Sequence, residues 1–177
     1  WINLVTDGPP ALALGVDPAD SGLMDLPPRP AGEGVLTARM WRGIVFVGAV
    51  MATGTLFVLD ASLPGGFVDG AGGLRYAQTM AFTTLMLFQI FNVLNARSDE
   101  QSAFVRLLTN RWLWMAMIGS IGLQVLVAYV PLLQRAFGTI GLTAADWVFC
   151  TAVASTVLWL REATKLTGAW RQRRPAA

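Results

Sequence analysis

Three oxygen-bearing side chains lie close together at the start of the chain and could bind a cation. Asn3, Thr6 and Asp7 are three and four residues apart in an otherwise apolar segment, so their side chains would share one face of a helix. The Gly-Pro-Pro sequence at 8–10 follows, and because proline lacks an N–H group, the carbonyls of Val5 and Thr6 would lose their helical donors. Carboxylate, amide, hydroxyl and carbonyl oxygens are the ligands that a hard cation prefers. The segment therefore predicts a helix broken at the prolines, with a cation site beside the break.

Asp7 is the most informative of these residues, because a carboxylate is costly inside a membrane. At the centre of a spanning helix it costs about 2.5–3.5 kcal/mol on insertion scales, so such residues are usually functional. A broken helix at membrane depth is tolerated only where it is packed in protein or lines a cavity, as in the ion sites of secondary transporters. The alternative is that Asp7 lies at the membrane surface and caps a helix. Its neighbours Asn3 and Thr6 favour a ligand.

Two amides, Gln89 and Asn92, lie three residues apart in a later apolar run and would also share a helix face. Buried amides commonly form hydrogen bonds between membrane helices, so spacing alone leaves that role open. The alternative, which spacing supports less well, is that Gln89 is a weaker metal ligand and Asn92 supports the ligands. Asn95, near the end of the run, is expected to cap the helix.

The composition places the chain among membrane proteins and excludes several kinds of site. It is 54% hydrophobic and only 14% charged, which is typical of a membrane domain. The basic residues lie at the ends of apolar runs and do not form a stripe with interleaved aromatics, so we expect no nucleic-acid partner. There is no histidine, and Cys150 is the only cysteine. A zinc or haem site and an intramolecular disulfide are therefore not expected.

Four further apolar runs are each near the roughly 20 residues that a spanning helix needs. They cover residues 41–59, 78–95, 112–130 and 146–160. Segments that are polar, or rich in glycine and proline, separate the runs and are expected to be loops. These segments are 15–39, 61–76, 97–111 and 132–145. The pattern predicts an all-α fold, a polytopic transmembrane helical bundle with half of one broken helix and four full membrane helices. Because the chain starts in mid-helix, we expect it to be the C-terminal part of a longer protein.

Basic residues gather on one side of the predicted bundle. Most of them fall on the side of the 15–39 loop, and only Arg75 and Arg135 fall on the other. By the positive-inside rule the first side is the cytoplasm, so the C-terminus is expected to be cytoplasmic. Arginine predominates over lysine, since Lys165 is the only lysine, and alanine is frequent. This composition favours a bacterial source and hence a plasma membrane.

Several segments resemble one known family, in order along the chain. Asn-Leu-Val-Thr-Asp-Gly at 3–8, with the Pro-Ala that follows it, resembles the sixth membrane helix of P-type calcium-transporting ATPases. Residues 17–29 resemble the loop after that helix, and residues 91–102 resemble the end of the eighth helix and the turn after it. The resemblance implies that the four full helices correspond to helices seven to ten. The chain would then be the C-terminal membrane part of a calcium pump.

The resemblance also implies a ligand set. Asn3, Thr6 and Asp7 match the calcium ligands of the family's sixth helix. Pumps that carry two calcium ions have a glutamate on the eighth helix where this chain has Gln89, and plasma-membrane calcium pumps, which carry one, also have glutamine. A single calcium ion per cycle is therefore expected.

The cycle implied by the resemblance is driven by ATP, although this chain would carry no ATP-hydrolysing residue. ATP, with Mg²⁺, would phosphorylate an aspartate in a cytosolic domain, and the resulting helix movement would weaken binding of the transported Ca²⁺. The actuator, phosphorylation and nucleotide domains and membrane helices one to five would lie outside this chain. The expected partners are the lipid bilayer and the remainder of the pump.

The expected organisation is one transmembrane domain over residues 1–177. It comprises the end of the sixth helix at 1–14, a cytoplasmic loop at 15–39, four membrane helices at 40–164 and a basic cytoplasmic tail at 165–177. Two other function classes remain open. An ion-coupled secondary transporter or channel could use the same broken helix without ATP, and a non-catalytic packing module could have the same helices. Manganese or sodium could also use these oxygens.

Overall fold

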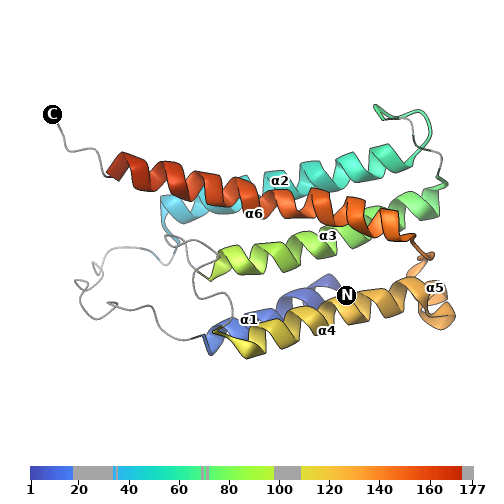
Figure 1. Ribbon diagram of the computed structural model, residues 1–177, viewed down its shortest axis with the longest axis horizontal. Coiled ribbons are helices and arrows are strands. Elements are labelled where there is room, and N and C mark those ends of the chain that lie inside the picture. The colour runs from blue at the N-terminus through green and yellow to red at the C-terminus, as the bar shows by residue number, and fades with distance from the viewer. Residues whose placement is uncertain (18–33, 35, 69, 71, 98–108, 173–177) are drawn as a thin grey trace.

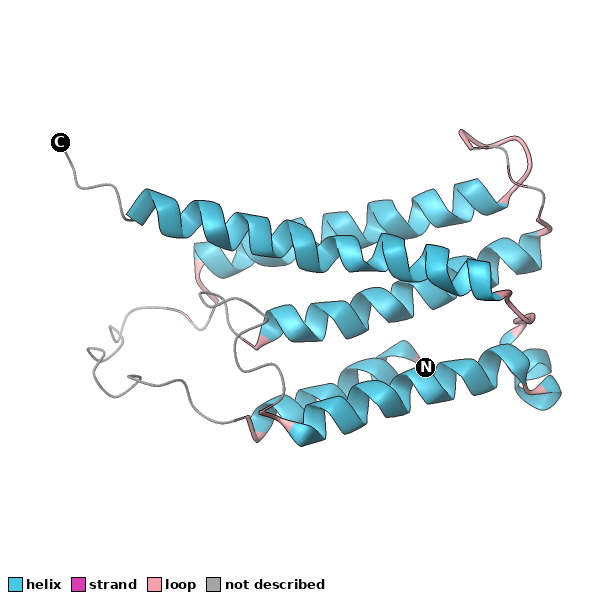
Figure 2. Ribbon diagram, in the orientation of Figure 1, coloured by secondary structure: helices cyan, strands magenta, loops and turns pink. Residues whose placement is uncertain are grey.

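The computed structural model describes residues 1–17, 34, 36–68, 70, 72–97 and 109–172, and in this part of the chain helices joined by loops occur without any strand (Figure 2). The elements in chain order are η1 (Ile2–Asp7), α1 (Gly8–Gly15), α2 (Ala38–Ser62), α3 (Leu74–Ala96), α4 (Arg111–Tyr129), α5 (Pro131–Phe137) and α6 (Ala144–Gln172). The predicted helical bundle is confirmed. Most of the predicted 15–39 loop, residues 98–108 and the end of the tail lie outside the described residues.

The helices form two groups that lie side by side (Figure 1). In the first group, α6 packs on α3 and both contact α2. In the second group, α1 lies along α4, and the short η1 contacts both α3 and α4. The end of α1, the start of α2, the end of α3 and the start of α4 lie at the same end of the bundle as the end of α6 (Figure 1). We call this the tail end of the bundle, and the other the far end.

Three helices are long and apolar enough to cross a membrane within the described residues: Met40–Ser62, Leu74–Ala96 and Arg111–Tyr129. The fourth predicted run, 146–160, lies within α6 but is not one of these three. It is shorter than the roughly 20 residues that a span requires, and Asp146 and Arg161 border it within the same helix. The helix α6 is nevertheless 29 residues long and packs along α3, so it belongs to the bundle.

The predicted loop at 132–145 is wrong in its first half, where the structure has the helix α5. Pro131 occupies the start of this helix, a position that suits proline because its fixed φ is helical and its missing N–H is not needed there. Gly138 ends the helix with a φ of 69°, a left-handed conformation that glycine adopts without strain. Both signals are present in the sequence, but the segment is too short to show a helical period.

Side-chain caps fix the starts of α2 and α6. The Thr37 hydroxyl accepts a hydrogen bond from the Met40 N–H at the start of α2, at 3.2 Å. At the start of α6, the Thr143 N–H donates to an Asp146 carboxylate oxygen at 2.7 Å, and the Asp146 N–H donates back to the Thr143 hydroxyl at 3.3 Å. This reciprocal pattern is a capping box formed with aspartate. Local sequence therefore determines where these two helices begin.

Gly54 lets the first group of helices approach closely. A Cβ atom at this position would lie 2.5 Å from the buried Phe88 ring of α3 and 3.3 Å from Val153 of α6. Small residues at helix contacts are a common device in membrane proteins. By contrast, a Cβ atom at Gly48 would meet nothing within 4 Å. Gly54 therefore allows α2 to approach α3 and α6 closely, whereas Gly48 has no part in this contact.

Candidate cation-binding segment

The predicted break near the prolines takes the form of a change of helix type. Residues Ile2–Asp7 form a π-helical turn in which the Gly8 N–H donates to the Asn3 carbonyl, five residues back. Asp7 and Gly8 keep right-handed helical dihedral angles, so η1 passes directly into α1, which has its prolines in the first turn. Proline is tolerated there because no intrahelical donor is needed. Wide turns of this kind are rare and occur frequently at functional sites.

The Val5 carbonyl has lost its helical donor, as the sequence predicts. Its donor would be residue 9 in an α-helix and residue 10 in a π-helix, and both are proline. The Ser120 hydroxyl of α4 donates to this carbonyl instead, at 2.6 Å, and both residues are buried. A backbone oxygen that would otherwise be unsatisfied at membrane depth is thus bound by a neighbouring helix.

The three predicted ligands differ in exposure. Asn3 is exposed and Asp7 is partly exposed, so the described helices leave Asn3 uncovered and cover Asp7 only in part. Thr6 is fully buried, and its hydroxyl donates to the Ile2 carbonyl one turn back at 2.7 Å. Its oxygen keeps lone pairs that could still accept or coordinate. The three residues thus share the π-helical turn but not one exposed surface, because Thr6 faces the chain's own helices.

Polar contacts hold α1 at the tail end of the bundle. The Asn110 side chain donates to the Ala13 carbonyl at 2.8 Å and, through its oxygen, accepts from the Leu113 N–H at 3.0 Å. Asp17, just after α1, forms an ion pair with Arg97, just after α3, with Nε to Oδ2 at 2.9 Å. These contacts join α1 to the start of α4 and to the end of α3.

Gln89 lies at about the same depth in the bundle as Asp7. The Asp17–Arg97 ion pair brings the ends of α1 and α3 close together, which gives a common starting point for counting along both helices. Gln89 precedes the end of α3 by seven residues and Asp7 precedes the end of α1 by eight, which is roughly 10 and 12 Å at 1.5 Å per residue. Because η1 contacts α3, the similar positions of Gln89 and Asp7 along their helices favour a site that both residues share.

The other amides of α3 and α4 have different surroundings. Gln89 and Asn92 are both half-buried. Asn95 is buried and donates to the Val157 carbonyl of α6 at 3.3 Å, so it joins two helices and does not cap α3. Deeper in the bundle, the buried Gln124 of α4 donates to the Thr83 hydroxyl of α3 at 3.2 Å. Asn95 was expected to be a cap, and this prediction is wrong because its side chain bonds to α6, while Arg97 occupies the cap position of α3.

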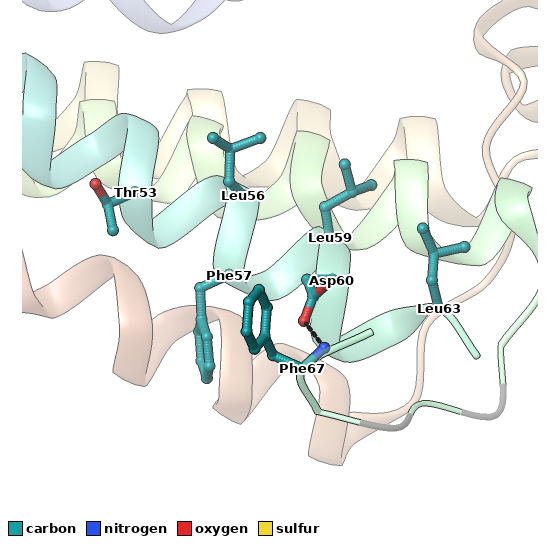
Figure 3. Close-up of a pocket in the computed structure, with 7 residues that line it drawn as sticks. All are labelled: Thr53, Leu56, Phe57, Leu59, Asp60, Leu63 and Phe67. Carbon is teal, nitrogen blue, oxygen red and sulfur yellow. Dashed lines mark hydrogen bonds between the residues drawn. The ribbon is translucent and has the colours of Figure 1, made fainter. Parts of the chain in front are cut away.

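A groove at the far end of α2 has an apolar lining (Figure 3). The rings of Phe57 and Phe67 lie next to each other along it, with Leu56 and Leu63 nearby. Its one carboxylate, Asp60, accepts from the Phe67 N–H at 2.9 Å and therefore fixes the loop after α2. This groove lies away from the predicted ligands, and its polar group is already used.

No group of three or more His, Cys, Asp or Glu side chains that could hold a metal occurs within the described part of the chain. Two residues that contact the candidate segment received no functional expectation from the sequence, namely Ser120 and Asn110. Ser120 lies in an apolar run as an ordinary helix-packing residue would. Asn110 stands directly before such a run, which is a recognisable cap signal, but its contact with Ala13 requires the tertiary structure.

The sequence over residues 1–167 matches the family of cation transporting ATPases, C-terminus. The chain belongs to this family. The match covers all the predicted ligands and the whole helical bundle as far as α6. The predicted family resemblance is therefore confirmed for the chain as a whole.

Curated relatives identify the branch of the family that this chain resembles. It is 38% identical over 167 residues to human calcium-transporting ATPase type 2C member 2, and 36% identical over 167 residues to the mouse protein of that name. It is also 36% identical over 166 residues to calcium-transporting ATPase 1 of Yarrowia lipolytica. These matches cover 93–94% of this chain but only 17% of each relative. The chain thus corresponds to a small part of a much longer protein in each case.

Proposed function

We propose that this chain supplies the C-terminal part of the ion-binding membrane region of an ATP-driven calcium pump. The observation that carries the proposal is the π-helical turn on which Asn3 is exposed and Asp7 is partly exposed. Family membership and relatives described as calcium-transporting ATPases support it. The same membership favours a pump over a secondary transporter, a channel or a packing module.

In this proposal Asp7 provides the negative charge of the site, and Asn3 and Thr6 provide neutral oxygens. Calcium accepts six to eight oxygen ligands in flexible geometry, so further ligands come from pump helices that are not part of this chain. Exposed Asn3 and half-exposed Asp7 are placed to meet such helices. Gln89, at the level of Asp7, is the weaker ligand, and Asn92, one turn further along α3, supports it.

The transport cycle requires a source of energy outside this chain. ATP and Mg²⁺ act in the cytosolic domains of the pump, where an aspartate is phosphorylated. The resulting movement of the membrane helices changes the coordination of Ca²⁺, which is the transported substrate. The contribution of this chain is to bind the ion through its carboxylate and neutral oxygens and to hold the η1–α1 segment against α4. Glutamine at position 89, in place of a second carboxylate, supports one calcium ion per cycle.

The bundle is proposed to cross the membrane with its tail end in the cytoplasm. Among the described residues, Arg42, Arg97 and Arg111 lie near that end, whereas Arg75 and Arg135 lie at the far end. This distribution follows the positive-inside rule. α6 is proposed as the fourth spanning helix, because it packs along α3. The relatives named above come from mammals and a yeast, so only the arginine-rich composition supports a bacterial plasma membrane.

The ligand assignment is tested by Asp7→Asn in the full-length pump. Removing the charge should abolish phosphorylation by ATP that depends on calcium, because the neutral site no longer binds the ion. Phosphorylation by inorganic phosphate without calcium should be retained, which shows that the protein is folded. Gln89→Ala is the comparison variant and should raise the calcium concentration for half-maximal phosphorylation by a smaller factor.

The result that would overturn the assignment is a wild-type calcium dependence in Asp7→Asn. A Gln89→Ala effect equal to that of Asp7→Asn would mean that the two ligands are ranked wrongly. Titration of the wild-type pump with Mn²⁺ and with Na⁺ checks the ion. Activation by either at a lower concentration than Ca²⁺ would overturn the choice of calcium, since both ions can use oxygen ligands.

A further inference from the structure

The Val5 carbonyl can receive no hydrogen bond from the usual backbone donors. Residues 9 and 10, the donors in α- and π-helical geometry, are prolines. Gly8, which could donate in the tighter 3₁₀ geometry, already donates to the Asn3 carbonyl. The only remaining source of a donor is another part of the protein, because the bilayer interior offers no water.

Ser120 provides this donor, and its geometry differs from that of the other serines that the structure describes. The hydroxyls of Ser62 and Ser155 donate to carbonyls of their own helices, at 2.7 and 2.8 Å. Such a back-bond is the usual choice of serine inside a helix. Ser120 instead donates across the interface from α4 to η1, at 2.6 Å, and is only 2% exposed.

The contact is positioned to determine how the π-helical turn faces. Val5 and Thr6 are buried on the side of η1 that contacts α3 and α4, while Asn3 and Leu4 are exposed. Holding the Val5 carbonyl against α4 therefore fixes the rotation of the turn about its axis. That rotation decides the direction of Asn3 and Asp7, which lie two residues before and two residues after Val5.

We propose that Ser120 is a positioning residue for the cation site: it acts through the Val5 carbonyl and does not touch the ion. The inference rests on the proposed function, because it assigns Ser120 a role in the same calcium site. The hydrogen bond keeps the Val5 oxygen directed towards α4 and keeps Asn3 and Asp7 directed towards the rest of the site. Without it, the turn would rotate to satisfy the carbonyl elsewhere, and the ligands would be displaced.

The test is Ser120→Ala in the full-length pump, read by two assays. The calcium concentration for half-maximal phosphorylation by ATP should rise about tenfold, the factor that corresponds to the loss of one buried hydrogen bond. The maximal level of phosphorylation by inorganic phosphate, measured without calcium, should be unchanged. Ser120→Cys keeps the size of the side chain with a weaker donor, so it should give a smaller shift. Ser155→Ala, which removes a hydroxyl bonded within its own helix, should leave both assays unchanged.

Two results would overturn the inference. One is a half-maximal calcium concentration in Ser120→Ala within twofold of the wild type. The other is an equal loss in both assays with no change in the calcium midpoint, which would make Ser120 a structural residue only. If either occurs while Asp7→Asn abolishes the calcium dependence, the proposed function stands without this role for Ser120. A wild-type calcium dependence in Asp7→Asn would instead overturn the proposed function itself.

Discussion

The two groups of helices are held together in different ways. The first group, formed by α2, α3 and α6, has an apolar interface whose largest buried residue is Phe88. The second group, formed by η1, α1 and α4, depends on side chains that donate to backbone carbonyls. Ser120 donates to the Val5 carbonyl and Asn110 to the Ala13 carbonyl. The first interface also contains one such bond, from Asn95 to the Val157 carbonyl, but close apolar packing around Phe88 distinguishes it, whereas the two carbonyl contacts distinguish the second.

This difference suggests a division of roles. Close packing has one favourable arrangement, because interiors are dense and resist deformation. A hydroxyl–carbonyl hydrogen bond contributes only about 0.5–1.5 kcal/mol net and can be exchanged for another partner. The segment with the predicted ligands is attached through such exchangeable contacts, while the helices beside it form a fixed frame. An ion site that must change its affinity during transport requires this combination.

The largest expected effect of a small substitution is in the frame, at Gly54. Gly54→Ala would place a methyl group 2.5 Å from the Phe88 ring, and overpacking of this kind costs about 1–3 kcal/mol. Gly48→Ala is the matched control on the same helix, where nothing lies within 4 Å. It should be neutral or stabilising by up to about 1 kcal/mol, since alanine favours a helix. Thermal unfolding in detergent measures both variants.

A double-mutant cycle on Gly54 and Phe88 provides a stricter check of the contact between them. In a Phe88→Ala background the ring is absent, so Gly54→Ala should cost less than it does in the wild type, with a coupling of about 0.5–3 kcal/mol. Additive effects of the two substitutions would mean that the frame does not depend on this contact. The claim that close apolar packing holds α2, α3 and α6 together would then be wrong.

An intermediate effect is expected at Asn110, in the hydrogen-bonded interface. Asn110→Ala removes both the cap of α4 and the bond to the Ala13 carbonyl, for a loss of about 1–2 kcal/mol in unfolding free energy. Asn110→Ser keeps a capping oxygen of similar strength but is too short to reach α1. Its loss should be about half as large. If Asn110→Ser is as stable as the wild type, the bond between α1 and α4 contributes nothing.

The fold could be predicted well from the sequence because membrane helices have a strong signal. Apolar runs between loops rich in glycine, proline and charge gave the positions of α2, α3 and α4 to within a few residues. The run 146–160 was placed correctly but underestimates α6, because a helix can continue past the apolar segment into Arg161 and Glu162. α5 was missed, since seven residues carry no detectable period.

The candidate site was predictable only in part. The prolines at 9 and 10 dictate that the Val5 carbonyl loses its donor, and this follows from covalent structure alone. Which residue replaces the donor does not follow, because Ser120 is 115 positions away along the chain. The burial of Thr6 also depends on how η1 packs against α3 and α4. The loss of the backbone donor could therefore be predicted from the sequence, whereas the orientation of the η1 side chains depends on tertiary contacts.

The smallest expected effect concerns the ion pair that joins α1 to α3. Arg97→Gln removes a partly buried pair with Asp17 and should lower the unfolding free energy by at most about 1 kcal/mol, the usual range for such pairs. The difference from the wild type should shrink as salt is raised from 0.1 to 1 M, because the Debye length falls from about 10 to about 3 Å. Arg75→Gln, at the far end of the bundle, is the charge-matched control and should show no such dependence. A loss at Arg97 that is unaffected by salt would mean that the side chain acts through packing or its bond to Thr109. The attachment of α1 would then be less electrostatic than its geometry indicates, and its carbonyl contacts with α4 would account for most of it.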